Sequence, residues 1–303
     1  MSINCGYHPY RDAAYAEALA EFGEPMDVAP WGNFILRRPI RDGTLMDAVG
    51  LYPLLTFMPN ADIPAGRRVL ETAGLVSFVG VADPFESPPP EVLAREFEVC
   101  YPFKQHAIID RRIGRPDFSK HHHYHIRRAL RHSLVERLPL RDHLDRWVEL
   151  YDELVEHRNI SGIQRFSRRY FERLAEMPCL GCFAARQNGV IVAMTLWLRG
   201  DRIAYYHLGA SSAIGYSVSA SYALIAAGIE EYGDCDILNL GGVAGLADDN
   251  GGLARFKRGF ANSSASAHLC GMILDRAAYD ILAADYGEGQ YFPAYRNPNA
   301  SGT

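Results

Sequence analysis

Residues 239–260 constrain the fold and chemistry of this chain more than any other stretch. They continue an apolar run of strand length, residues 235–240, and then five glycines cluster with an Asp-Asp-Asn sequence. This pattern predicts a strand, a long turn and a helix that begins near Gly252, with Asp249 or Asn250 as its cap. The free N–H groups at such a helix start form a pocket for a phosphate or a carboxylate.

Phe256 and Lys257 fall one turn into this predicted helix. An aromatic ring beside an ammonium suits a nucleotide or an activated acyl group, because stacking holds the carrier and positive charge stabilises an oxygen as it becomes negative. The alternative is structural: a core phenylalanine next to a solvated lysine. The residue types by themselves leave both interpretations open.

The phrase strand, Leu-Gly-Gly, acidic turn, Gly-Leu-x-x-Phe-Lys-x-Gly-Phe resembles the signature of the FemAB-like transferases. These are the peptidoglycan bridge aminoacyltransferases, built on the GNAT acyltransferase fold. The sequence His-Ile-Arg-Arg-Ala-Leu-Arg, from residue 125, is similar to the basic helix of that family, and residues 182–208 resemble its paired central strands. The resemblance covers roughly residues 105–285.

The resemblance implies an activity and two residue roles. In the family, the lysine of the Phe-Lys pair lies at the acyl ester of the donor and offsets charge in the tetrahedral intermediate; Lys257 and Phe256 match these positions. Family members take the acyl group from charged tRNA and form an amide on an amine-bearing cell-wall precursor. For this chain the acceptor could equally be an amino sugar or an amine in a small natural product.

A basic segment supports an anionic partner. Residues 111–141 contain nine Lys or Arg and two acids, together with five histidines, although the whole chain carries a net charge of −5. Such a segment attracts phosphates or an RNA end, with an affinity that falls as salt rises. We expect Arg127, Arg128 and Arg131 to contact phosphate, and a solvated helix face is the alternative.

The amide-forming step also needs a proton route and a place for the incoming amine. Tyr206 and His207 are the candidate catalytic groups beside Lys257, and Tyr216 and Tyr222 are candidates for the substrate cleft. Packing is the common role of such residues on strands. Asp249 could orient the amine, with a turn or cap role as its alternative.

The donor is a second open question. Acyl-CoA enzymes of the GNAT type hold the pyrophosphate on a loop that reads Gln/Arg-x-x-Gly-x-Gly/Ala, whereas residues 209–216 here read Gly-Ala-Ser-Ser-Ala-Ile-Gly-Tyr. This difference favours aminoacyl-tRNA as co-substrate, with acyl-CoA as the alternative and no resident cofactor. A non-catalytic RNA- or nucleotide-binding module is the alternative from another functional class.

The order of predicted elements gives the fold class. Helices near 119–133, 141–158 and 167–176 precede strands near 180–187, 190–198 and 203–208, and the first two strands are joined by a hairpin turn at Asn188-Gly189. A helix near 219–232 and a strand at 235–240 follow. This order predicts an α+β, GNAT-like domain. With the family resemblance, we expect two tandem GNAT-like units: a degenerate one at 1–115, a transferase domain at 116–290 and a tail at 291–303.

Composition and length indicate a globular protein with a full core. The chain has 303 residues, 48% of them hydrophobic, without a basic leader or an apolar run long enough to cross a bilayer. We therefore expect a cytoplasmic protein without membrane insertion. Six scattered cysteines suit free thiols. We expect no metal at Cys179-x-x-Cys182 or at His121 and His125, because no second ligand pair accompanies either.

Overall fold

The computed structural model gives the chain an α+β fold, as predicted. Its elements alternate along the chain, and each sheet region has helices packed against it. The structure describes residues 8–41, 43–160, 162–242, 251–286 and 291–297.

The chain divides into two compact units. The first contains residues 1–9 and 105–265, and the second contains residues 10–104 and 266–303. Each unit thus combines two segments, whereas the predicted division at residues 115 and 290 follows chain order. The candidate site lies in the first unit.

The first unit is built on a mixed sheet in the order β5-β10-β9-β8-β7-β6. An antiparallel meander, β7 to β9, forms its larger part, and β10 lies parallel to β9 and antiparallel to β5. The strands are β5 (Val99–Asp110), β6 (Leu134–Arg137), β7 (Leu180–Gln187), β8 (Val190–Arg199), β9 (Ile203–Ser211) and β10 (Ile237–Asn239).

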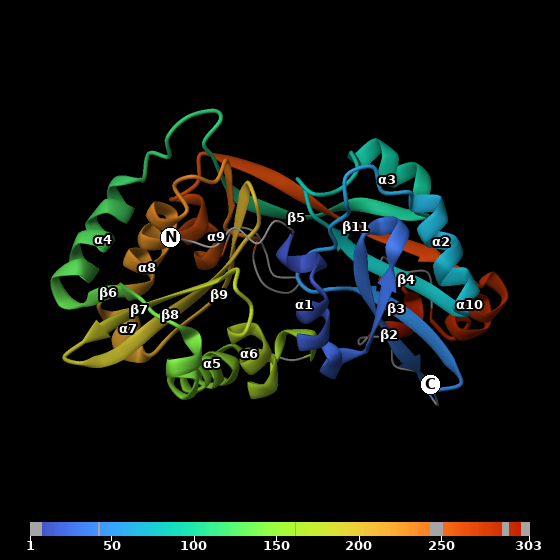
Figure 1. Cartoon of the computed structure of the whole chain (residues 1–303), viewed down its shortest axis with the longest axis horizontal. Coiled ribbons are helices and arrows are strands. Elements are labelled where there is room, and N and C mark those ends of the chain that lie inside the picture. Colours follow the sequence, from blue (N-terminus) through green and yellow to red (C-terminus); the bar gives the residue numbers. More distant parts are fainter. Residues whose placement is uncertain (1–7, 42, 161, 243–250, 287–290, 298–303) are drawn as a thin grey trace. The chain divides into compact units, whose positions relative to one another are not determined.

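Helices cover both faces of this sheet (Figure 1). Helix α8 packs on β7 and β8 on one face, with α4 against it, and α5 packs on β8 and β9 on the other. The helices are α4 (Lys120–His132), α5 (Leu144–Arg158), α6 (Arg168–Ala175), α7 (Ala213–Ser217), α8 (Ala220–Glu231) and α9 (Gly252–Arg258), with 3-10 turns η4 (Leu140–His143) and η5 (Gly162–Gln164).

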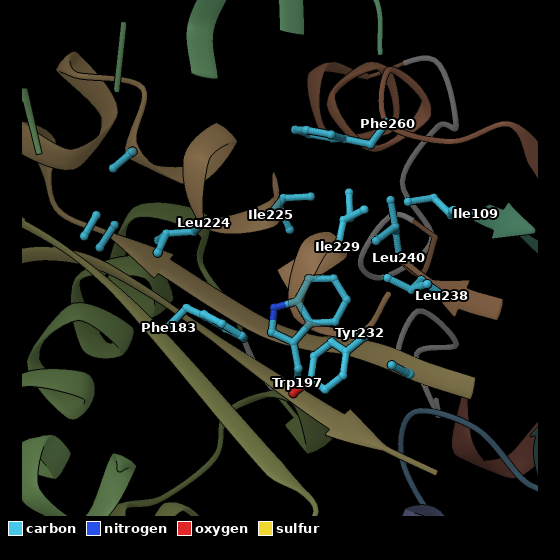
Figure 2. Close-up of a cluster of buried hydrophobic side chains, with 14 of the residues drawn as sticks. Ile109, Phe183, Trp197, Leu224, Ile225, Ile229, Tyr232, Leu238, Leu240 and Phe260 are labelled. Atoms are coloured by element: carbon cyan, nitrogen blue, oxygen red, sulfur yellow. The ribbon is translucent and has the colours of Figure 1, made fainter. Parts of the chain in front are cut away.

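The core of the first unit lies between the sheet and helix α8. Trp197 of β8 is fully buried there, in one cluster with Leu224 and Ile229 of α8 and Phe260 after α9 (Figure 2). Gly228 permits this packing, because a Cβ at that position would overlap the indole ring of Trp197. The cluster therefore fixes α8 and the end of α9 above the central strands.

The second unit has a sheet in the order β1-β2-β3-β4-β11. Its core contains Trp31, Phe57, Phe78 and Phe97. Its elements are η1 (Pro9–Arg11), α1 (Ala13–Ala18), η2 (Ala20–Phe22), β1 (Glu24–Val28), η3 (Ala29–Trp31), β2 (Asn33–Ile40), β3 (Leu45–Gly50), α2 (Ile63–Thr72), β4 (Leu75–Ala82), α3 (Pro90–Glu96), β11 (Ser263–Ile273), α10 (Arg276–Ala283) and η6 (Ala294–Arg296).

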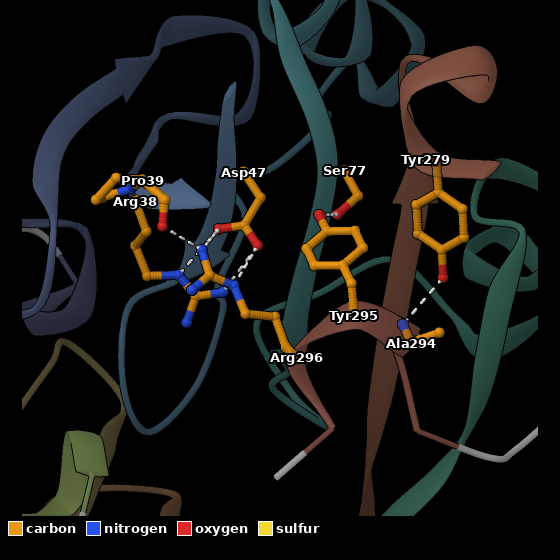
Figure 3. A network of polar contacts seen from close by, with 8 residues as sticks. All are labelled: Arg38, Pro39, Asp47, Ser77, Tyr279, Ala294, Tyr295 and Arg296. Atoms are coloured by element: carbon orange, nitrogen blue, oxygen red, sulfur yellow. Dashed lines mark hydrogen bonds and ion pairs between the residues drawn. The ribbon is translucent and has the colours of Figure 1, made fainter. Parts of the chain in front are cut away.

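The end of the described chain is anchored in this second unit, although we predicted a tail from residue 291. The guanidinium of Arg296 donates to both carboxylate oxygens of Asp47, at 2.9 and 3.0 Å, and Arg38 donates to the same carboxylate (Figure 3). Tyr295 is buried, and its hydroxyl lies 2.7 Å from that of Ser77. A buried carboxylate requires such partners, which explains why the segment is held.

Candidate active site

Two parallel strands separate at the centre of the first unit. β10 and β9 are paired from Ile237 opposite Ile203 to Asn239 opposite Tyr205. Beyond Asn239 the pairing with β9 ends, but the chain stays beside β5, where the N–H of Leu240 donates to the carbonyl of Ala107 at 3.0 Å. β9 meanwhile continues to Ser211. We call this point of separation the fork.

A β-bulge lies in β9 next to the fork. Trp197 of β8 is opposite Tyr206, but Leu196, the residue before Trp197, is opposite Leu208. His207 is therefore the extra residue, and bulges of this kind bend a strand and increase its twist. The bulge gives β9 a local reason to diverge from β10 at the fork.

Lys257 of α9 reaches the fork. Its Nζ donates to the carbonyl of Gly242 at 2.6 Å and lies over the ring of Tyr206, 5.5 Å from the centroid. Gly241 has φ +74°, a conformation that favours glycine, and a Cβ there would lie 3.2 Å from Nζ. The ammonium is thus held between the two diverging strands, by a carbonyl on one side and an aromatic face on the other.

Phe256 lies inside an aromatic cluster formed by α4, α8 and α9. Its ring meets that of Tyr222 edge-on, with centroids 4.8 Å apart, and stacks on His122 at 6.2 Å. His122 Nε2 donates to the Phe256 carbonyl at 2.8 Å, and His122 Nδ1 lies 2.7 Å from the hydroxyl of Ser119. Because a carbonyl only accepts, the proton of the neutral imidazole is on Nε2 and Ser119 donates to Nδ1.

Burial lowers the pKa of His122, and the neighbouring histidines add to this shift. The neutral imidazole is thus the form that the cluster stabilises. The position of Gly259 reinforces the arrangement, because three ring atoms of His122 fill the place that a Cβ would take there. His122 consequently joins the start of α4 to the end of α9 and fixes the helix that carries Lys257.

The start of α8 is held by side chains of α4. The Nδ1 of His125 lies 2.8 Å from the hydroxyl of Ser219, and its ring stacks on Tyr222 at 4.7 Å. Arg128 donates to the carbonyl of Ser217 at 2.8 Å. The predicted phosphate contact at Arg128 therefore competes with a bond to the protein itself, whereas Arg127 and Arg131 are exposed.

The loop between β9 and α8 uses most of its own N–H groups. Ser212 caps α7 by accepting from the Gly215 N–H, and the N–H groups of residues 212, 216, 218 and 219 bond to backbone carbonyls. A Cβ at Gly215 would overlap the carbonyl of Val192, so packing accounts for this glycine. Few N–H groups in this loop remain for a pyrophosphate.

The structure brings together only part of the predicted site. Tyr206 lies beside Lys257, and burial raises the pKa of its phenol, with a smaller contribution from the nearby phenol of Tyr216. Tyr222 contacts Phe256 rather than Lys257. Asp249 lies outside the described residues.

His207 is not brought to Lys257. Its Nε2 lies 2.6 Å from the hydroxyl of Tyr170 on α6, the helix layer opposite α8. Burial lowers the pKa of His207 to about 3, so the ring is neutral at physiological pH and a weak base. Side chains of adjacent strand residues point to opposite faces of the sheet, which accounts for the separation of His207 from Tyr206.

Two residues at the fork, Asn239 and His106, were not predicted from the sequence. Asn239 is 1% exposed, and its Oδ1 accepts from the Gly241 N–H at 2.8 Å and from His106 Nδ1 at 3.0 Å. A single asparagine inside the apolar run 235–240, directly before Leu-Gly-Gly, is the signal that could have drawn attention to it. His106 carries no such signal, because 133 positions separate it from Asn239.

Among the described residues, no group of three His, Cys, Asp or Glu side chains is placed to hold a metal ion. Cys179 and Cys182 are both buried in the first unit, and burial raises the pKa of the Cys182 thiol to about 12. That thiol is therefore protonated at neutral pH.

Comparison with known proteins supports the fold. Residues 118–258, from just before α4 to the end of α9, match the acetyltransferase (GNAT) domain family. The sequence matches no curated protein. In the part of the chain that the structure describes, no helix has the length and apolar character needed to cross a membrane.

Solved structures resemble the whole chain. FemX has a TM-score of 0.65 at 13% identity, with 90% of this chain and 95% of FemX covered. The C-terminal domain named as a lysylphosphatidylglycerol synthetase of Agrobacterium fabrum has a TM-score of 0.60 at 16% identity, with 91% of each chain covered. L-PGS of Bacillus licheniformis has a TM-score of 0.54 at 16% identity, covering 90% of this chain and 95% of that one.

Proposed function

Given that the chain has a GNAT fold of the FemAB-like type, we propose that it is a transferase that forms an amide bond by moving an aminoacyl or acyl group onto an amine. The observation that carries this proposal is the position of Lys257 at the fork. A carbonyl oxygen that enters between the diverging strands meets a fixed positive charge there. Such charges act most strongly on the oxygen that becomes negative in the transition state.

The reaction follows from this placement. A neutral amine attacks the carbonyl carbon of the donor ester, a C–N bond forms, and the oxyanion is stabilised by the ammonium of Lys257. The intermediate then breaks its C–O bond, and a proton from the attacking nitrogen passes to the leaving oxygen. Burial raises the pKa of Tyr206, so its phenol stays protonated and can relay this proton: it gives its own proton to the leaving oxygen and receives the one from the nitrogen.

Two features support aminoacyl-tRNA as the donor. The loop between β9 and α8 has few N–H groups left for the pyrophosphate of CoA. Arg127 and Arg131, one turn apart on the exposed face of α4, offer positive charge that suits an RNA backbone. A charged tRNA donor places the reaction in the cytoplasm.

The acceptor we propose is an amine-bearing envelope precursor, amino sugar or small natural product. The resemblance to the FemAB-like transferases supports the first of these, and the match to FemX over nearly the whole chain is consistent with it. The chain is also similar to a domain whose name gives lysylphosphatidylglycerol, a lipid, as the product. The amine acceptor therefore needs a direct test.

The test is donor cleavage by the full chain, with alanyl-minihelix RNA and acetyl-CoA offered separately with a mixture of amines. We expect loss of the alanyl ester, and a decrease of about 10²–10³-fold in Lys257→Ala, the range found when one oxyanion donor is removed. Lys104→Ala is the matched control, because the chain has only three lysines and Lys104 belongs to the second unit. Equal activity of wild type and Lys257→Ala rejects the catalytic role.

One observation favours a second candidate, an acyl-CoA-dependent N-acyltransferase: the matched family is an acetyltransferase family. Turnover of acetyl-CoA without cleavage of the alanyl-minihelix would support that function. Binding of RNA without turnover of either donor would instead indicate the non-catalytic nucleotide- or RNA-binding module.

A further inference from the structure

Asn239 carries a buried donor without an acceptor. Its Oδ1 already accepts two hydrogen bonds, from Gly241 and His106. Its Nδ2 has no hydrogen-bond partner within the described part of the chain. The orientation of the carboxamide is fixed, because only the oxygen can accept from the backbone N–H of Gly241. Native proteins rarely leave a buried donor in this state, so it marks a candidate ligand contact.

The side chain of Asn239 lies on the face of the sheet away from Lys257. Leu238 and Leu240, its neighbours on either side, belong to the core beneath α8, and side chains alternate along a strand. Tyr205, opposite Asn239 in register, shares its face, and the Tyr205 hydroxyl lies 2.8 Å from His8 Nε2. With His106, these side chains form a buried polar row across β5, β10 and β9.

The two faces meet at the fork. On the face with α8 and α9, Lys257 binds the carbonyl of Gly242. On the face with the polar row, Asn239 binds the N–H of Gly241, the adjacent residue. The donor and the acceptor of an acyl transfer must come into contact, and this position allows them to approach from opposite faces.

This inference rests on the proposed function. We propose that Asn239 is an acceptor-binding residue, whose Nδ2 donates a hydrogen bond to a carbonyl oxygen next to the reactive amine. The acceptor then approaches the fork from the polar row, and the donor from the face with Lys257 and the basic helix α4. A carbonyl oxygen fits because the Oδ1 of Asn239 is already saturated, so this carboxamide can donate to the ligand but has little capacity to accept from it.

The experiment compares two small amines as acceptors, with alanyl-minihelix RNA as donor. Glycinamide has a carbonyl next to its amine, and n-propylamine, of similar size, has none. Asn239→Asp keeps an oxygen for Gly241 and His106 and replaces the Nδ2 donor by a second oxygen. Asn188→Asp, in the exposed turn between β7 and β8, is the matched control.

We expect the ratio of transfer to glycinamide over transfer to n-propylamine to fall about tenfold in Asn239→Asp, the size of effect typical of one hydrogen bond, and to stay unchanged in Asn188→Asp. A ratio equal to that of wild type overturns the inference. Because each variant is compared through a ratio, a general loss of activity does not imitate the result.

A second measurement needs no substrate. Acetic anhydride labels lysines, and mass spectrometry compares Lys257 with Lys104 and Lys120 in the same sample. We expect the relative labelling of Lys257 to be the same in wild type and Asn239→Asp. If it changes, Asn239 acts by positioning Lys257 and the ligand contact is overturned. Loss of the proposed function itself is recognised separately, by full turnover in Lys257→Ala.

Discussion

Gly259→Ala tests whether the junction between α4 and α9 is as tightly packed as the structure indicates. The backbone of Gly259 is helical, with φ −71°, so alanine is compatible with it and gains about 0.5–1 kcal/mol over glycine. Its Cβ, however, would lie within 3.0 Å of three ring atoms of His122. The outcome therefore depends on whether that ring can move.

The contacts of His122 give the magnitude. Displacing the ring breaks its hydrogen bonds to the Phe256 carbonyl and to Ser119, each with a net contribution of about 1 kcal/mol. Overpacking adds about 1–3 kcal/mol. After the gain from alanine is subtracted, we expect Gly259→Ala to lower the free energy of unfolding by about 2–4 kcal/mol.

The assay is urea unfolding followed by circular dichroism, with the double-mutant cycle of Gly259→Ala and His122→Ala. Once the imidazole is absent, Gly259→Ala should no longer destabilise. Gly252→Ala is the control in the same helix, because a Cβ there meets no atom within 4 Å. Additive effects of the two substitutions, or a Gly259→Ala variant as stable as wild type, would refute the reasoning.

Three further predictions concern charge. His207 has a folded-state pKa of about 3, below its value in an unfolded chain, so the unfolded state binds more protons as the pH falls. The free energy of unfolding should therefore decrease as the pH decreases from about 6.5 toward 3. His207→Gln should flatten the pH dependence of the urea midpoint. Asp47→Ala leaves two guanidiniums without their shared carboxylate and should cost about 2–4 kcal/mol in urea unfolding, whereas Arg37→Ala, which removes an exposed ion pair, should cost less than about 1 kcal/mol. Replacing Arg127 and Arg131 together by Ala should weaken minihelix binding at low salt and reduce its dependence on salt in a fluorescence titration; an unchanged salt slope would exclude both residues from the RNA contact.

Local pattern predicted much of the first unit. The helices α5 and α8 and the strands β7, β8 and β9 lie close to their predicted positions. Each contains a clear apolar run, and Asn188-Gly189 marks the turn between β7 and β8. Other elements depend on distant contacts. β6 has four residues and is defined by its pairing with β7. The pattern does not predict α2, because Pro64 and Gly66 are residue types that disfavour a helix. Gly66 occurs there because a Cβ at that position would overlap the ring of Trp31.

The site was predictable in its chemistry but not in its geometry. Lys257 and Tyr206 were both singled out, and in the structure the Nζ of Lys257 lies over the ring of Tyr206. His207 was expected beside them, but adjacent residues of a strand point to opposite faces, so His207 contacts Tyr170 on the other side of the sheet. Asn239 was not predicted, because two features of the folded chain single it out. Its Oδ1 accepts from His106 on β5, and its Nδ2 has no hydrogen-bond partner in the described part of the chain.

The interleaved units have a consequence for synthesis. The second unit begins at residue 10, but β4 pairs with β11 (Ser263–Ile273). Its sheet therefore cannot be completed until β11 has left the ribosome. The first unit is nearly complete by residue 265. We therefore expect the unit that contains Lys257 to fold first. Until β11 is synthesised, the edge of β4 that pairs with it stays unpaired, and a chaperone would need to protect that edge.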